Sequence, residues 1–342
     1  MNSKRPDTRR LLWFIALVLT LAVPALRAQE AEQAASVQQA TELPDGLQTV
    51  SFFSPAVSRQ MKFDIVLPPG YEASGERYPV LYLLHGYMQN YTVWGRNLGA
   101  AFYARNFSDL IVVMPDAGNS WYINYARNED NQRNNWEDHI VRDVIGHVDS
   151  NFRTLARREG RAIAGLSMGG YGAVMLGLRH PELFVSVAST SGALAHARNR
   201  ATAIEEGQPA PVPRSTEDSP ELARADAFIS QIIDIPGFSR QDDRNPKGID
   251  FETVEQARAY DPFHIIYDVP KSQLPHIYLD SGVDDGLITA AREFMQILML
   301  NDVPFDYMQS GGRHNSEYWR RSIGHLMSVQ YEVMQRALGN RP

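Results

Sequence analysis

The sequence of 342 residues contains no cysteine. The absence of thiols excludes a cysteine nucleophile, cysteine-ligated zinc and disulfide crosslinks. A chain of this length can bury a core large enough to fold without such crosslinks. Hydrophobic residues make up 44% and charged residues 21% of the chain. These fractions are typical of a globular protein.

Clusters of positive charge are also scarce. The chain has 33 Lys and Arg against 40 Asp and Glu, which gives a net charge of −7. Apart from the first residues, basic side chains gather only in 153–161, which we interpret as a solvated helix end and turn. Nucleic acid is therefore not an expected partner. No group of histidines and carboxylates has the spacing of metal ligands, so the sequence implies no metal and no cofactor.

Long hydrophobic runs are absent except near the start. Residues 11–26 are apolar and follow a basic segment, the pattern of a secretory signal peptide. We expect cleavage after Ala28, giving a secreted or periplasmic protein with no stable membrane insertion. The alternative is a retained anchor, but the run contains Pro24 and is shorter than the roughly 20 residues of a spanning helix. Residues 29–46 are rich in Ala, Gln and Glu, and they predict a flexible leader.

The remaining chain, 47–342, alternates between strand and helix patterns. Continuous apolar runs predict strands at 61–68, 78–86, 110–116, 161–167, 184–190, 276–282 and 305–310. Helical patterns lie around 94–107, 136–152, 169–179, 288–301 and 315–338. Such alternation predicts an α/β fold with a mostly parallel central sheet and helices on both faces. The first strands can form an antiparallel edge.

An insertion of about 195–258 separates the strand at 184–190 from the strand at 276–282. This connection is much longer than a strand–helix–strand crossover needs. It contains a proline-rich acidic segment, 205–221, and an amphipathic helix candidate, 222–234. Two interpretations stay open: a partial cap beside the site, or a solvated excursion without a role.

A serine flanked by glycines follows the predicted strand 161–167. Residues Gly165 to Gly169 read Gly-Leu-Ser-Met-Gly, the G-x-S-x-G pattern of a nucleophile elbow. The pattern requires a strand before it and a helix after it, and both are predicted here. The turn is so tight that the residues two before and two after Ser167 crowd each other, which explains the two glycines. Ser167 is the candidate nucleophile.

A serine hydroxyl needs a base, and the base needs an orienting acid. In this fold class the order along the chain is serine, acid, histidine. His314, in a glycine-rich loop after the last predicted strand, is the candidate base. Asp285 is the preferred acid and Asp284 the alternative. Asp280 lies inside its strand, and we expect it to matter mainly for stability.

Two backbone N–H groups are candidates for an oxyanion hole, which stabilises the charge that develops on a carbonyl oxygen during acyl transfer. One belongs to Met168, directly after the nucleophile. The other belongs to Tyr87, in the loop that follows the strand 78–86.

Five segments carry a resemblance to a known family: 78–86, 111–125, 162–184, 279–287 and 311–319. In their order and motifs they resemble the esterase D, or "putative esterase", family of the α/β-hydrolases over roughly 48–195 and 258–335. The resemblance implies a serine carboxylesterase. It also implies Ser167 as nucleophile, Asp285 as acid and His314 as base. One departure from the family pattern is Arg313, which stands between the glycine pair and the histidine.

The family includes feruloyl and acetylxylan esterases, so the resemblance implies acetyl or feruloyl esters of carbohydrates as substrates. Export argues against its S-formylglutathione hydrolases, whose substrate is cytosolic. The candidate pocket residues, for which plain packing is the alternative, are Asn119, Ser120, Trp121, Tyr122 and Trp319. Two other functions stay open: an acyltransferase that uses the same triad with a sugar or alcohol acceptor, and a non-catalytic carbohydrate-binding relative.

Overall fold

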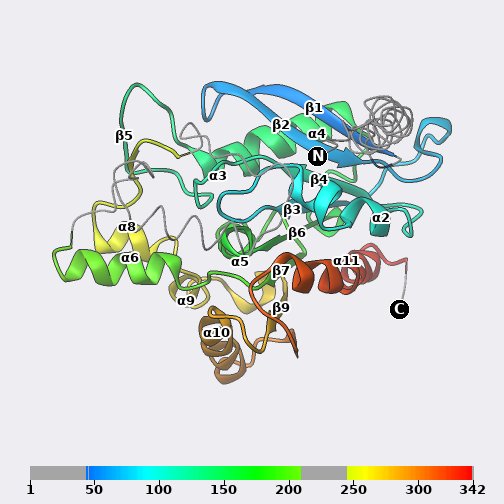
Figure 1. The fold of residues 1–342 in the computed structure, drawn as a ribbon. Coiled ribbons are helices and arrows are strands. Elements are labelled where there is room, and N and C mark those ends of the chain that lie inside the picture. Colours follow the sequence, from blue (N-terminus) through cyan, green and yellow to red (C-terminus); the bar gives the residue numbers. More distant parts are fainter. Residues whose placement is uncertain (1–43, 45, 209–244, 341–342) are drawn as a thin grey trace, which may run out of the picture. The chain divides into compact units, whose positions relative to one another are not determined.

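An eight-stranded sheet forms the centre of the computed structural model, which describes residues 44, 46–208 and 245–340 (Figure 1). The strand order is β1-β2-β4-β3-β6-β7-β9-β10. The strands are β1 (Leu47–Ser54), β2 (Arg59–Val66), β3 (Val80–Leu84), β4 (Ile111–Pro115), β6 (Arg161–Leu166), β7 (Ser186–Thr190), β9 (His276–Gly282) and β10 (Phe305–Ser310). From β4 to β10 all neighbours are parallel, whereas β1–β2 and β2–β4 are antiparallel. The predicted mostly parallel sheet with an antiparallel edge is confirmed.

Helices cover both faces of this sheet, as expected. The longer ones are α5 (Met168–Arg179), α6 (His196–Glu205), α10 (Ile288–Leu300) and α11 (Ser316–Ala337). Shorter ones are α2 (Ala100–Ala104), α3 (Trp136–Asp138), α4 (Ile145–Asn151), α8 (Val254–Arg258) and α9 (Pro262–Ile265). Two predicted helices are interrupted: π-helical turns at Val93–Asn97 and His139–Val144 divide 94–107 and 136–152 into shorter pieces.

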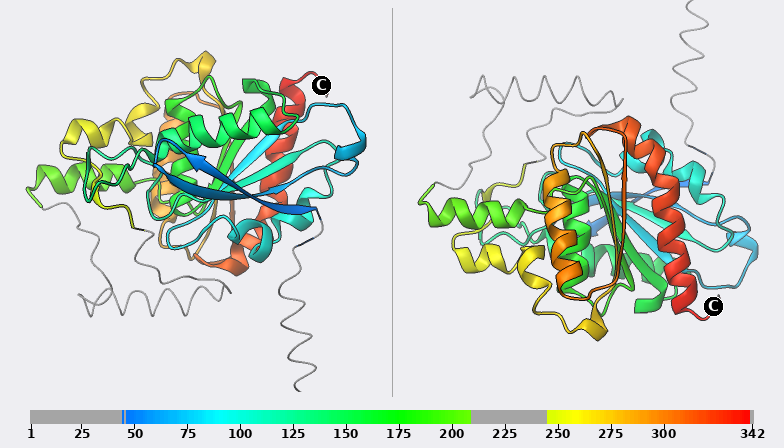
Figure 2. Two further views of the ribbon diagram at one scale, coloured as in Figure 1. Left: turned by 90° about the horizontal axis from the view of Figure 1, so that it is seen from above. Right: turned by 90° about the horizontal axis from the view of Figure 1, so that it is seen from below.

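Two apolar cores lie on the two faces of the sheet, and successive side chains of a strand pack alternately into one core and the other. Tyr82 and Leu84 of β3 join one core, and Leu81 and Leu83 join the other. Helices α4, α5 and α10 pack on the first face, and α2 and α11 pack on the second. Figure 2 shows α10 and α11 on opposite sides of the strands. Because central strands such as β3 and β4 are covered on both faces, their sequences read as continuous apolar runs.

Part of the predicted insertion lies within the described residues. Helices α6 and α8 pack against each other, and β8 (Gly248–Ile249) pairs antiparallel with β5 (Arg127–Asn128). The predicted helix 222–234 and most of 205–221 fall outside the described residues. So do the predicted signal peptide 1–28 and nearly all of the leader 29–46. Within the described ranges, no helix combines the length and the hydropathy needed to cross a membrane.

Candidate active site

Ser167 occupies the turn between β6 and α5, with φ 54° and ψ −117°. This backbone conformation is strained for a residue with a side chain, and such strain persists only where neighbours hold it. The Ser167 N–H donates to the carbonyl of Thr190 at 3.1 Å. The Ser167 carbonyl accepts from the N–H groups of Tyr171 (3.1 Å) and Ala193 (3.0 Å). Three hydrogen bonds from two neighbouring segments therefore fix the turn that presents the hydroxyl.

The two glycines that flank the serine are required for different reasons. A Cβ at Gly165 would lie 2.2 Å from the carbonyl oxygen of Gly169, so the expected crowding across the turn is present. A Cβ at Gly169 would instead lie 2.3 Å from the carbonyl oxygen of Leu84, at the end of β3. The predicted crowding between Gly165 and Gly169 is therefore present, and Gly169 in addition allows α5 to begin directly against the neighbouring strand.

Ser167, His314 and Asp285 are joined by a continuous line of hydrogen bonds. The Nε2 atom of His314 lies 3.0 Å from the Oγ atom of Ser167. Its Nδ1 atom lies 3.0 Å and 3.2 Å from the two carboxylate oxygens of Asp285. A carboxylate only accepts, so Nδ1 carries the proton and Nε2 is left to accept from the serine hydroxyl. The imidazole is thus held in the tautomer that can take a proton from Ser167.

Burial and hydrogen bonding oppose each other at Asp285. Its side chain is fully buried, which by itself raises the pKa of the carboxyl. The hydrogen bond from His314, the charge of that ring and the N–H of Leu287 at 2.8 Å outweigh burial and lower the pKa below its usual value. The carboxyl therefore stays ionised at neutral pH, the state that accepts from the imidazole. The alternative acid, Asp284, is exposed to solvent.

Backbone hydrogen bonds join the acid loop to the histidine loop. The N–H of Val283 donates to the carbonyl of Ser310 at 2.9 Å, and the N–H of Asp284 donates to the carbonyl of Gly312 at 3.0 Å. Arg313, the residue that departs from the family pattern, is exposed, and His314 still reaches both of its partners. The extra side chain is accommodated on the surface.

The loop after β3 lies against the nucleophile. A Cβ placed on Gly86 would be 3.3 Å from the Cβ of Ser167. The N–H of Gly86 donates to Gln89 at 2.8 Å, and the N–H of Met88 donates to Asn119 at 2.7 Å. Tyr87 stands between these two anchored residues. The structure therefore brings the Tyr87 segment, like Met168 at the start of α5, to the side of Ser167, and the oxyanion role of both N–H groups stays a prediction.

His85 and Tyr122 hold this loop in place, a role that the sequence pattern did not indicate. The hydroxyl of Tyr122 donates to the carbonyl of His85 at 2.8 Å. The His85 ring accepts from the N–H of Ala117 at 3.0 Å, and its Nδ1 donates to the carbonyl of Gly86 at 2.8 Å. Both side chains are fully buried. In the sequence, the one local sign of this role is a His-Gly pair at the end of an apolar strand. Such a pair does not indicate which distant residues the histidine contacts.

The predicted pocket residues do not share one environment. Ser120 and Tyr122 are fully buried, and the Ser120 hydroxyl accepts from the Tyr122 N–H at 3.1 Å, so both support the loop. Asn119 is buried and joins Met88 to Asn245. Only Trp121 is partly exposed.

Trp121 belongs to a cluster of aromatic rings. The cluster includes Tyr171, which lies in α5 one helical turn after Ser167. Trp121 stacks on His196 of α6, with ring centroids 3.6 Å apart and planes 5° apart. Its centroid lies 6.0 Å from Tyr87 and 6.0 Å from Tyr171. Tyr87 is 40% exposed. Aromatic faces therefore reach solvent on this side of the nucleophile.

Trp319 belongs to the apolar core on one face of the sheet, whereas Trp121 packs against the core on the other face. Trp319 is buried in the first turn of α11, and the edge of its ring system meets His314 at 5.0 Å between centroids and 87° between planes. Trp319 therefore packs against the ring of the candidate base, His314.

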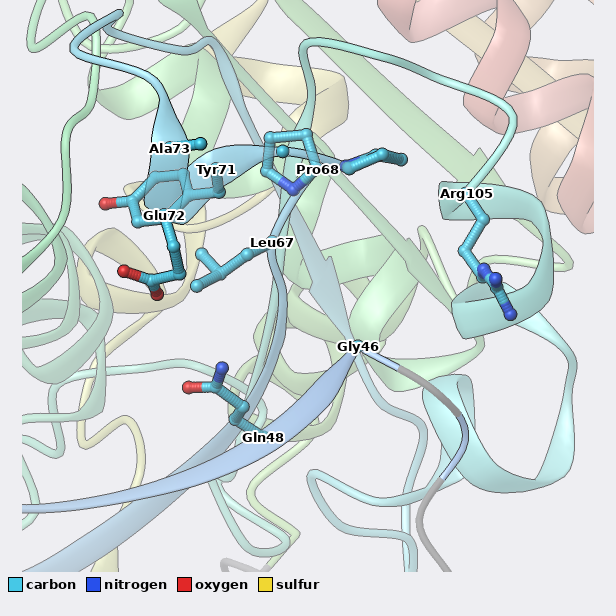
Figure 3. A pocket seen from close by; sticks show the side chains of 10 residues that line it. Gly46, Gln48, Leu67, Pro68, Tyr71, Glu72, Ala73 and Arg105 are labelled. Carbon is cyan, nitrogen blue, oxygen red and sulfur yellow. The ribbon is translucent and has the colours of Figure 1, made fainter.

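A surface pocket of about 450 Å³ lies away from the triad (Figure 3). Its lining includes Gln48, Glu72 and Arg105. The pocket adjoins the end of β2, which pairs with the beginning of β4, whereas the triad lies beyond the carboxyl ends of the parallel strands. This pocket is therefore not the candidate active site. Among the residues that the structure describes, no group of three or more histidines and carboxylates is placed to hold a metal ion.

The α/β sheet and the Ser167–His314–Asp285 line together define a serine hydrolase of the α/β-hydrolase fold. A fluorophosphonate-binding serine hydrolase of Staphylococcus aureus, FphF, has the same fold: it superposes with a TM-score of 0.63 at 21% identity, covering 83% of this chain and 97% of its own. The family model described as "putative esterase" matches residues 54–325. The chain belongs to this family, and the predicted resemblance is confirmed.

Curated relatives include two esterases. An esterase of Mycobacterium tuberculosis is 36% identical over 148 residues, which is 41% of this chain and 31% of that protein. The alignment thus spans about a third of the relative's length. An acetyl esterase of Caldicellulosiruptor saccharolyticus is 24% identical over 262 residues, covering 77% of this chain and 86% of the relative.

Proposed function

We propose that this chain hydrolyses carboxylic esters, with Ser167 as nucleophile, His314 as general base and Asp285 as the acid that orients the base. The observation that carries the proposal is the unbroken hydrogen-bond line from Ser167 through His314 to buried Asp285. Membership of the esterase family supports ester hydrolysis as the reaction.

The proposed reaction has two halves. In the first, the Oγ atom of Ser167 attacks the ester carbonyl while its proton passes to Nε2 of His314. The tetrahedral intermediate collapses, the C–O bond to the alcohol breaks, and the alcohol leaves with the proton from Nε2. In the second half, water gives its proton to Nε2 and its oxygen attacks the acyl-serine. The new tetrahedral intermediate collapses, the bond between the acyl carbon and Oγ breaks, and Oγ takes the proton from Nε2 as the acid is released.

Two backbone N–H groups would stabilise the oxyanion in both halves. We assign them to Met168, at the positive end of α5, and to Tyr87, in the loop that packs on Ser167. Asp285 would hold the ring and stabilise the imidazolium without taking up the proton.

The substrates that we propose are acetyl or feruloyl esters of carbohydrates. The acetyl esterase relative, which aligns over most of both chains, supports a short acyl group. The exposed ring of Tyr87 and the partly exposed ring of Trp121 support a ligand with a flat or ring-shaped surface, because sugars and phenolic groups pack well on aromatic faces. The basic and apolar start of the sequence supports export to the periplasm or the medium.

A substrate panel tests the reaction and its specificity together. p-Nitrophenyl esters of increasing chain length would be compared with acetylated and feruloylated xylo-oligosaccharides, with Ser167→Ala as the blank. We expect turnover of short-chain and saccharide esters and stoichiometric labelling of Ser167 by a fluorophosphonate. Absence of both turnover and labelling in the wild-type protein would refute the esterase and leave a non-catalytic carbohydrate-binding protein. Acyl transfer to an added sugar in preference to water would show an acyltransferase instead.

Export has a separate test. Expression of the full chain in a Gram-negative host, followed by N-terminal mass spectrometry of the exported fraction, should find a chain that begins at Gln29 or within a few residues of it. Recovery of the uncleaved chain in the membrane fraction would favour the retained anchor.

A further inference from the structure

Asp280 is a buried carboxylate that the proposed reaction does not use. It lies in β9, between Thr190 of β7 and Met308 of β10, and is 1% exposed. Its Oδ1 atom accepts two hydrogen bonds: from the Thr190 hydroxyl at 2.5 Å and from the Tyr318 hydroxyl at 3.0 Å. An ionised carboxylate at this depth is costly unless donors surround it. The two hydroxyls are therefore important to this site.

The first donor belongs to the segment that fixes the nucleophile. The backbone carbonyl of Thr190 accepts the N–H of Ser167 at 3.1 Å, while its side chain donates to Asp280. The next residue, Ser191, gives its N–H to the backbone carbonyl of Asp280 at 2.8 Å. The end of β7 is thus held between Ser167 on one side and Asp280 on the other.

The second donor belongs to the segment that carries the base. Tyr318 is 1% exposed and lies in the first turn of α11, four residues after His314. Its N–H donates to the side chain of Asn315 at 3.1 Å, which caps α11. Its ring fills the space beside Gly312, where an added Cβ would come within 2.5 Å of it. The histidine loop therefore rests on the ring whose hydroxyl is bound to Asp280.

Asp280 itself belongs to the segment that carries the acid. It precedes Asp285 in the same strand and loop, so the two carboxyl groups share one piece of backbone. Burial raises the pKa of Asp280 to about 6, the hydrogen bonds from Thr190 and Tyr318 act to lower it, and the charge of Asp285 raises it further.

We infer that Asp280, Thr190 and Tyr318 form a buried clamp that aligns the three segments bearing Ser167, Asp285 and His314. Tyr318 and Thr190 are positioning residues in this clamp, since neither touches the reacting atoms. The inference rests on the proposed function, because alignment has a measurable consequence only if the triad reacts. It assigns Asp280 a role beyond the contribution to stability that the sequence predicted.

The chain offers a matched control on the same helix. Tyr331 of α11 also donates its hydroxyl to a carboxylate, that of Asp109, which precedes β4 at the end of the parallel strands away from the triad. Tyr318→Phe and Tyr331→Phe each remove one tyrosine hydroxyl from an aspartate and leave the ring. A purely structural role predicts similar effects of the two variants, whereas a clamp predicts that only Tyr318→Phe alters catalysis.

The experiment measures kcat, KM and the rate of fluorophosphonate labelling for the wild type and both variants at equal folded fraction. We expect Tyr318→Phe to lower kcat and the labelling rate at least fivefold with KM unchanged within twofold. Tyr331→Phe should leave all three within twofold of wild type. Equal kcat and labelling rates in the two variants would overturn the clamp. A wild-type protein that neither turns over esters nor labels would instead refute the proposed function.

Thr190 gives a second test, independent of the helix. Thr190→Val removes the hydroxyl with little change of shape and should lower kcat as Tyr318→Phe does. Thr190→Ser keeps the hydroxyl and should retain at least half of the wild-type kcat. If kcat falls in both Thr190→Val and Thr190→Ser, or in neither of them, the result contradicts the clamp. If Tyr318→Phe and Thr190→Val both fail to fold, the network is structural and the positioning role is overturned.

Discussion

Asp285 directs its carboxylate into the protein against His314, whereas its neighbour in the chain, Asp284, is exposed to solvent. The turn after β9 thus separates the acid that the sequence analysis preferred from the alternative. We expect Asp285→Asn to lower kcat by about 10⁴, because an amide neither fixes the working tautomer nor stabilises the imidazolium. Asp284→Asn should change kcat less than threefold. Both are measured at equal folded fraction by circular dichroism, and a larger loss in Asp284→Asn would move the acid to that residue.

Ser167→Ala should abolish turnover and leave the fold intact. The hydroxyl is the only group of Ser167 that the proposed reaction uses, and the three backbone hydrogen bonds of the turn remain in the variant. We expect kcat to fall by about 10⁴ or more. The measurement is hydrolysis of a p-nitrophenyl ester, with circular dichroism and a thermal unfolding curve as controls. Retention of a tenth of the wild-type kcat would exclude Ser167 as nucleophile.

The value of kcat/KM should rise toward alkaline pH in a single step, because the proposed base must be a neutral imidazole. A protonated imidazole cannot accept the proton of Ser167, so activity is lost on the acid side. Asp285 adds no second step above about pH 4, because its pKa is lowered from an already acidic value. The profile is measured with a substrate whose leaving group does not titrate. EDTA should leave it unchanged, and an EDTA inhibition that zinc reverses would contradict the serine mechanism.

Gly165→Ala should destabilise the elbow. Its Cβ would meet the backbone of Gly169 at 2.2 Å, and a carbonyl oxygen cannot move aside as a flexible side chain can. We expect a loss of at least about 2 kcal/mol in the free energy of unfolding, together with loss of activity. Gly146→Ala is the control, since a Cβ at that position in α4 has nothing within 4 Å and should be neutral or stabilising. Equal unfolding free energies for the two variants would contradict the packing argument.

His196 should make the fold sensitive to acid. Burial lowers its pKa to about 3, with Asp250 acting to raise it and Arg200 to lower it. The pKa of His196 in the folded protein lies below the usual value for a histidine. Below about pH 6.5, His196 therefore binds a proton in the unfolded chain but stays neutral in the folded protein. This contribution to stability is lost as the pH falls.

His196→Phe keeps a flat ring beside Trp121 but does not titrate. Between pH 7 and 4.5, the free energy of unfolding of the wild type should fall by about 3 kcal/mol more than that of the variant. Urea unfolding at a series of pH values measures the difference. Parallel curves would show that His196 is accessible to protons in the folded state.

Much of this protein could be predicted from the sequence because the relevant information is local. A serine between glycines, after an apolar strand and before a helical pattern, already specifies a nucleophile elbow, and the structure has β6 and α5 on either side of Ser167. The strands predicted at 276–282 and 305–310 have the predicted bounds. Buried parallel strands and amphipathic helices leave periodic patterns that depend on each segment alone.

Contacts between distant segments were decided only by the tertiary structure. Strand β1 was not predicted, because its exposure alternates irregularly and it is defined by pairing with β2. Gly169 is required by Leu84, and Trp121 stacks on His196, a residue from the insertion. The clamp joins Thr190, Asp280 and Tyr318 from three elements. Each of these side chains has an ordinary local pattern, and its role arises only when the sheet brings its partner within hydrogen-bond or packing distance.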